Sequence, residues 1–158
     1  MRRIGLSTVP ATLCLLAALL TGCANTPKDV TQGWSNERLY QEARDEVSAG
    51  AWDKAIGFLD KLEGRAAGTV LAQQAQIDKA YAQYRNNDKV PAIATLDRFM
   101  RLHPTSPAMD YALYLKGLIN FNDNLGLFSA LINQDLSERD QKAAKESYES
   151  FLELSRRF

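Results

Sequence analysis

The feature that most constrains the fold is a helical hairpin that recurs along the chain at an offset of 37 residues. Its clearest copy spans residues 76–104, where two runs with helical apolar spacing flank a polar break at residues 86–88. Ala80 and Ala92 place one small side chain on each run, and small residues let two helix axes approach closely. Because one hairpin cannot bury its apolar faces alone, the pattern predicts neighbouring copies.

The neighbouring copies stand where the offset places them. Ala43 and Ala55 precede the two small positions by 37 residues, within a first copy over residues 36–62. Gly117 follows the first small position by 37 residues, but Ala144 follows the second by 52, which puts about 15 extra residues into the third copy. The sequence therefore predicts an all-α solenoid of about three hairpins. The alternative, an unrelated helical bundle, would not produce a repeated offset.

The N-terminus has the form of an export signal that ends in a lipidation site. A basic head at residues 1–3 precedes an apolar run over residues 4–20, and Leu20-Thr21-Gly22-Cys23 resembles the bacterial lipobox. Residues 1–22 are therefore expected to be a removed signal peptide. Cys23 is expected to carry acyl chains that anchor the protein to a membrane surface. The alternative is an ordinary signal that happens to end before a cysteine.

The mature chain then starts with a tether and has no disulfide. Cys14 leaves with the signal, so the acylated cysteine has no partner. In enterobacterial lipoprotein sorting, Asp after the lipidated cysteine favours the inner membrane; Ala24 favours the periplasmic face of the outer membrane. Residues 23–35 are polar and read as a flexible tether, with domain residues 36–158 divided into repeats at about 36–69, 70–106 and 107–158.

Charge and motifs exclude several classes of protein. Formal net charge is zero, and removing Arg2 and Arg3 with the signal leaves 17 basic against 19 acidic residues, so nucleic acid is not an expected partner. The single histidine, His103, precedes Pro104 at a helix end, where its usual role is structural. No phosphate-binding loop, nucleophile elbow or metal-ligand spacing appears. We expect a binding protein with no cofactor or metal, and not an enzyme.

A peptide groove is the expected binding site. In a right-handed stack of hairpins the first helices line the concave face. According to the 37-residue offset, the residues that face the concave side are Tyr40, Arg44, Val47, Ile77, Tyr81, Tyr84, Arg85, Tyr111, Tyr114, Leu118 and Phe121. Aromatic rings give large contact area at low entropy cost, and arginine binds carboxylates with two parallel hydrogen bonds. The candidate groove residues are Tyr40, Arg44, Tyr81, Tyr84, Arg85 and Tyr114, suited to an extended peptide with an aromatic, free C-terminus. Alternatively, several of these tyrosines fill seams between repeats.

The sequence also resembles a known family. The lipobox, followed by ERLYQEA, AYAQY, LDRFMRLHPTSPAMDYALYLKGL and DLSERDQKAAKES, is similar to the BamD family, also called ComL-type lipoproteins, of the outer-membrane β-barrel assembly machinery. The resemblance implies tetratricopeptide-like hairpins, five in the family. It implies an N-terminal half that receives C-terminal signals of unfolded outer-membrane β-barrel proteins. The C-terminal half would dock BamA and other subunits.

The chain departs from that family at two places. Residues 65–69 lack the aromatic-Pro-Phe-Gly segment of many members, and the chain ends at Phe158 where the family continues into two more repeats. We therefore expect a fragment without most of the docking half, with Tyr148, Phe151 or Leu154 exposed at its end. A second possible role is that of a periplasmic helical-repeat adaptor lipoprotein in cell-wall synthesis or secretion.

Overall fold

A computed structural model of the chain describes residues 29–121 and 136–158. The signal, the lipidation site Cys23 and the first part of the tether, residues 23–28, lie outside these residues. The chain divides into two units, Met1–Gly33 and Trp34–Phe158. In the first, the backbone N–H and the hydroxyl of Thr31 donate to Asp29 Oδ1, at 3.0 and 2.7 Å. The second unit holds all the helices described below.

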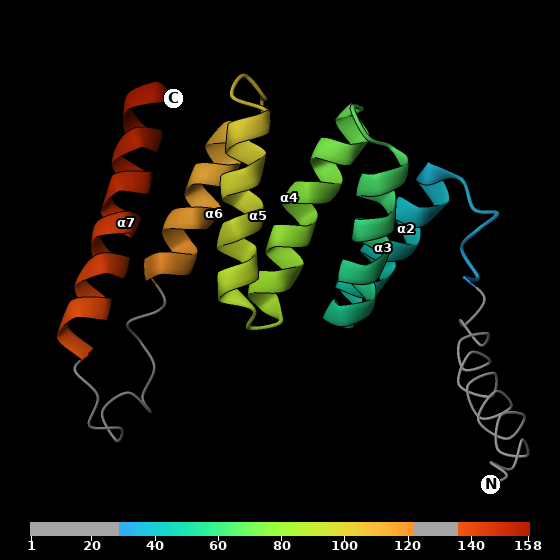
Figure 1. The fold of residues 1–158 in the computed structure, drawn as a ribbon, viewed down its shortest axis with the longest axis horizontal. Coiled ribbons are helices and arrows are strands. Elements are labelled where there is room, and N and C mark those ends of the chain that lie inside the picture. The colour runs from blue at the N-terminus through green and yellow to red at the C-terminus, as the bar shows by residue number, and fades with distance from the viewer. Residues whose placement is uncertain (1–28, 122–135) are drawn as a thin grey trace, which may run out of the picture. The chain divides into compact units, whose positions relative to one another are not determined.

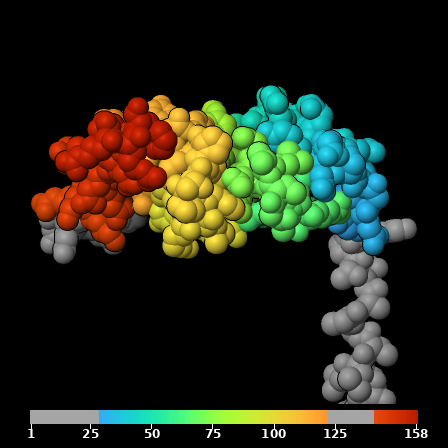
Figure 2. Space-filling model, turned by 90° about the horizontal axis from the view of Figure 1, so that it is seen from above, coloured from blue at the N-terminus to red at the C-terminus, as the bar shows by residue number. Residues whose placement is uncertain are grey.

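The described part of the second unit is entirely helical. Its helices are α2 (Asn36–Ser48), α3 (Trp52–Arg65), α4 (Val70–Arg85), α5 (Lys89–Leu102), α6 (Met109–Phe121) and α7 (Leu136–Arg157). They pack as the hairpins α2–α3, α4–α5 and α6–α7, and α3–α4 and α5–α6 contacts join each hairpin to the next (Figure 1). The space-filling view follows the same order from α2 to α7 (Figure 2). The predicted all-α solenoid is confirmed.

Local signals set the helix boundaries. The side chains of Ser35 and Thr69 cap α2 and α4, each accepting a backbone N–H at 3.2 Å. Gly50 and Asn87 have positive φ in the turns inside the first two hairpins, where the chain must reverse. The first copy, expected over residues 36–62, is slightly too short, because α3 continues to Arg65. Leu62, in the last turn of α3, is still fully buried.

Two apolar clusters form the core, and α4 belongs to both. The first joins Leu39, Ala43, Leu59, Leu62 and Ala66 to Ala72 and Ala75 of α4. The second contains Ile77, Ala80, Ala92, Leu96, Phe99, Ala112, Leu115 and Ile119. Burying one such large side chain contributes roughly 1.5–3 kcal/mol. The first two hairpins therefore stabilise each other through α4, as a solenoid requires.

The small residues lie at the helix crossings, with one correction in the third hairpin. Ala43, Ala55, Ala80 and Ala92 are all completely buried. Ala144, which was expected to continue the series, is exposed.

Ser147 faces the crossing in its place. Its hydroxyl donates to the carbonyl of Gly117 at 2.9 Å, and the ring of Phe151 covers the same glycine. The prediction was wrong by three residues, nearly one helical turn, because the insertion before α7 interrupts the 37-residue offset. The expectation that Tyr148 is exposed is confirmed.

A repeated ion pair also joins the hairpins. Lys79 of α4 binds Asp60 of α3 at 2.7 Å, and Lys116 of α6 binds Asp97 of α5 at the same distance. Both partners of the second pair follow those of the first by 37 residues. The offset therefore repeats contacts between hairpins as well as contacts within them.

Candidate functional site

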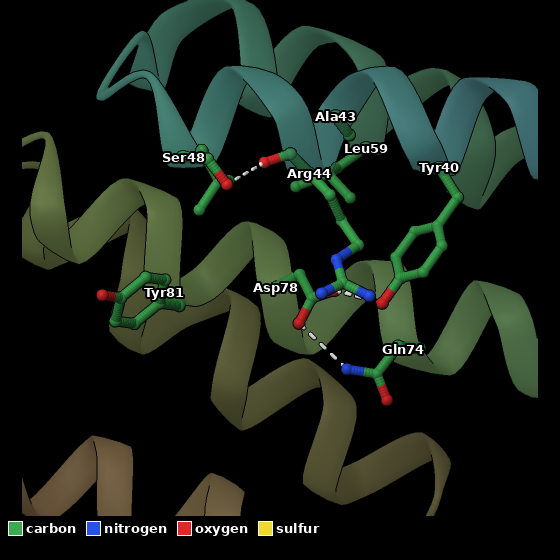
Figure 3. A pocket seen from close by; sticks show the side chains of 9 residues that line it. Tyr40, Ala43, Arg44, Ser48, Leu59, Gln74, Asp78 and Tyr81 are labelled. Atoms are coloured by element: carbon green, nitrogen blue, oxygen red, sulfur yellow. Dashed lines mark hydrogen bonds between the residues drawn. The ribbon is translucent and has the colours of Figure 1, made fainter.

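Three of the six candidate groove residues, together with Val47 of the wider predicted face, line one pocket between α2 and α4. Its volume is about 410 Å3, and its lining consists of Tyr40, Ala43, Arg44, Val47, Ser48, Leu59, Gln74, Asp78 and Tyr81. Figure 3 shows Tyr40 and Arg44 reaching from α2 toward Asp78 of α4. The structure therefore brings together Tyr40, Arg44 and Tyr81. The sequence predicted that they would share a face formed by the first helices of successive hairpins.

Asp78 was missed by the sequence analysis, although it is the polar centre of the pocket. It accepts hydrogen bonds from Tyr40 Oη to Oδ2 at 2.8 Å and from Gln74 Nε2 to Oδ1 at 2.9 Å. Burial, together with the hydrogen bond to Asp78 and its charge, raises the pKa of Tyr40 to about 12, so the phenol stays protonated and donates. A usable signal was the helical spacing, since Asp78 precedes Tyr81 by three residues and shares its face.

The two predicted arginines differ in how far they are engaged. Arg85 Nη1 donates to Tyr81 Oη at 2.7 Å, and its guanidinium carbon lies 4.8 Å from the ring centroid of Trp52. The guanidinium of Arg44 forms no hydrogen bond or ion pair within the described ranges. Arg44 is thus available to an anionic ligand, whereas Arg85 holds two aromatic rings in place.

The remaining predicted groove residues lie outside the pocket. Tyr84 is half-buried and packs against the second core cluster. Ile77 is only 2% exposed, so its expected place in the groove was wrong: the side chain belongs to the core instead. Tyr114 of α6 is 46% exposed.

Tyr114 belongs to an aromatic row on α6 and α7. Its ring centroid lies 6.3 Å from those of Tyr111 and Phe151. Burial raises the pKa of Tyr111, and electrostatic interactions with Tyr81, Asp78 and Tyr114 raise it further. Helix α6, which carries Tyr111, is in contact with α4. We call the pocket together with this row (Tyr111, Tyr114 and Phe151) the groove face.

The groove face carries aromatic, charged and polar groups. Within residues 29–121 and 136–158, no three His, Cys, Asp or Glu side chains gather as a metal site would require. No helix in those ranges combines the length and apolarity that a membrane crossing needs. What the groove face offers is aromatic surface, one unengaged cation and one hydrogen-bonded carboxylate, which are the elements of peptide recognition.

Comparison with known proteins agrees with this picture. The model of a tetratricopeptide repeat family matches residues 27–158. The chain is 44% identical over 153 residues to the outer membrane protein assembly factor BamD of Neisseria meningitidis serogroup B. The matched region covers 97% of this chain and 57% of the relative. It is 35% identical over 144 residues to the protein of that name from Vibrio cholerae, covering 91% of this chain and 59% of the relative.

These matches confirm the resemblance to BamD expected from the sequence motifs. The chain spans less than two thirds of the length of these curated relatives. Because the repeat family's model covers most of the chain, and the structure has the stacked helical hairpins that such repeats form, the chain belongs to the tetratricopeptide repeat family.

Proposed function

We propose that this chain is a lipid-anchored scaffold of the outer-membrane β-barrel assembly machinery. It receives the C-terminal signals of unfolded outer-membrane β-barrel proteins and docks partner subunits, BamA among them. The observation that carries the proposal is the 44% identity, over 97% of the chain, to a protein named as an outer membrane protein assembly factor. The proposed location is the periplasmic face of the outer membrane, held there by acyl chains on Cys23.

The groove face supports the receptor part of this proposal. An unfolded barrel protein presents an extended C-terminus with aromatic side chains and a free carboxylate. Tyr40, Tyr81 and Tyr114 offer aromatic contact area, and Arg44 offers a guanidinium with no partner in the described ranges. Arg85 keeps Tyr81 in place through its hydrogen bond.

A peptide titration tests the receptor function. A labelled peptide copied from the C-terminus of a barrel protein and ending in Phe is titrated with the protein by fluorescence anisotropy. We expect weak, saturable binding, because an extended peptide loses conformational entropy when it is ordered. Amidating the peptide carboxylate should weaken binding by roughly tenfold or more, the size of a lost charged hydrogen bond.

Two variants locate the carboxylate. Arg44→Gln should bind the free-acid and amidated peptides alike, whereas Arg101→Gln, an equal charge change on an exposed residue of α5, should still distinguish them. If the parent shows no saturable binding of the free-acid peptide, the chain is not the receptor.

Affinity purification tests the place in the machinery. When the full chain is recovered from envelope membranes, co-purification of BamA supports the proposal. Recovery of cell-wall synthases in place of BamA would contradict it and favour a periplasmic adaptor of cell-wall synthesis.

A further inference from the structure

The pocket between α2 and α4 offers a hydrogen-bond acceptor beside its donor, and a receptor for a bare carboxylate would use only the donor. Asp78 and Arg44 both line the pocket, and Figure 3 shows their side chains converging there from opposite helices. A carboxylate alone would gain from the guanidinium but be repelled by Asp78. The ligand that suits this pocket must therefore satisfy both groups.

Asp78 has capacity left for a ligand. An ionised carboxylate has about four lone-pair sites. Tyr40 and Gln74 each occupy one site, on different oxygens, at 2.8 and 2.9 Å. The hydroxyl of Tyr40 donates in this contact and holds the carboxylate in the pocket wall. A donor on the ligand can therefore still reach Asp78.

The last residue of a peptide carries the complementary pair of groups. Its carboxylate is an acceptor, and its own backbone N–H, one carbon away, is a donor. Among internal residues only Asp and Glu combine an N–H with a carboxylate, and their carboxylate lies at least one carbon farther from the N–H than that of a terminal residue. The pocket volume, about 410 Å3, is at the low end for ligand sites and fits one residue better than a long segment.

We propose that this pocket takes the terminal residue of the bound peptide, with Arg44 receiving the carboxylate and Asp78 accepting the N–H of the last peptide bond. The terminal side chain lies between the rings of Tyr40 and Tyr81. This inference rests on the proposed receptor function and adds to it a second recognition residue, one that requires the peptide to end in the pocket.

Backbone ester substitution tests the contact with Asp78. An ester at the last peptide bond replaces the N–H by oxygen and leaves the side chains and the carboxylate in place. We expect it to bind the parent roughly threefold to tenfold more weakly than the all-amide peptide, as one lost hydrogen bond implies. The same replacement three bonds upstream is the control for the general effect of an ester, and we expect it to cost less.

The variant Asp78→Ala should abolish the difference between the terminal ester and the all-amide peptide. Its matched control is Asp45→Ala, because Asp45 also accepts a hydrogen bond from a glutamine four residues earlier but does not line the pocket. In this control the ester should still bind more weakly. Removing the charge of Asp78 also alters the affinity for any carboxylate. The quantity to compare is therefore the ratio of the affinities of one variant for the all-amide peptide and for the terminal ester.

The outcomes separate this inference from the function on which it rests. Equal affinities of the parent for the terminal ester and the upstream ester, or an ester effect that persists in Asp78→Ala, would overturn the role of Asp78 and leave the receptor function standing. Failure of the all-amide peptide to bind the parent would overturn both.

Discussion

At the scale of single residues, the surroundings of a charged side chain decide whether it lines the pocket or contacts other side chains of the protein. Arg44 and Asp78 line the pocket, while Arg85 is held by Tyr81 and Trp52. Away from the groove face, Glu63 of α3 is an electrostatic junction between hairpins. Its side chain binds Lys79 of α4 at 2.7 Å and also pairs with Arg98 of α5.

The pKa of Glu63 shows which effect prevails at that junction. Burial alone would raise the pKa of this carboxyl group, but the hydrogen bond from Lys79 and the charges of Lys79 and Arg98 outweigh burial and lower it. The folded protein therefore holds Glu63 ionised at a pH where the unfolded chain would already take up a proton. The stabilisation is complete above the ordinary pKa of 4.5 and is lost as pH falls through the lowered value.

Glu63→Gln should therefore lower the melting temperature at neutral pH, and the difference from the parent should shrink as pH falls below about 4.5. Thermal unfolding followed by circular dichroism across that range measures it. Glu149→Gln, at an exposed pair with Lys145, should differ little from the parent at any pH. A Glu63→Gln curve parallel to the parent curve down to the acid limit would contradict the assignment.

At the scale of elements, the close approach of helices depends on small residues in each hairpin. Gly117 is the extreme case, since a Cβ placed there would come within 2.8 Å of the Phe151 ring. Gly57, on the exposed side of α3, would have no atom within 4 Å of an added Cβ. The same substitution should therefore have opposite effects at these two glycines.

Gly57→Ala should stabilise the protein by about 0.5–1 kcal/mol, the usual gain when glycine leaves a helix interior. Gly117→Ala should destabilise it, because overpacking typically costs about 1–3 kcal/mol and exceeds that gain. Urea unfolding gives both free energies. Adding Phe151→Leu to Gly117→Ala should recover part of the loss; equal stabilisation at both glycines would show that α7 does not pack against Gly117.

The elements were predictable from sequence because their signals are local or periodic. Helical spacing and the Ser35 cap are set by neighbouring residues, and the small residues of the first two hairpins are related by one 37-residue offset. The register of α7 was not predictable, since the insertion removes the periodic reference, and Ser147 rather than Ala144 meets Gly117. The engagement of Arg85 and the role of Asp78 depend on side-chain positions across two helices, which no offset specifies.

At the scale of the whole molecule, the proposed function needs both a membrane anchor and a peptide groove. The anchor rests on the lipobox at residues 20–23 and lies outside the described residues. The groove face runs from the pocket between α2 and α4 to the aromatic row on α6 and α7. Such a design would hold an unfolded chain near the membrane into which it is to be inserted.

Cys23→Ser should release the protein from the membrane, because acyl chains on this residue are the proposed anchor. Fractionation of the envelope should then find the variant as a periplasmic protein or as an unprocessed precursor. Ala24→Ser, which leaves the acylated cysteine intact, should remain membrane-bound. Stable retention of processed Cys23→Ser in the outer membrane would contradict the lipobox assignment.

The direction in which the peptide lies along the groove face shows whether its C-terminus is the end bound at Arg44. A peptide of about ten residues, roughly 33 Å when extended, carries a nitroxide label near its C-terminus or at its N-terminus, and broadening of protein amide signals is recorded by NMR. With the terminal carboxylate at Arg44, the label near the C-terminus should broaden α2 and α4, and the N-terminal label should broaden α6. Broadening in the reverse order, or mainly of α3 and α5, would contradict a C-terminal signal bound in this groove.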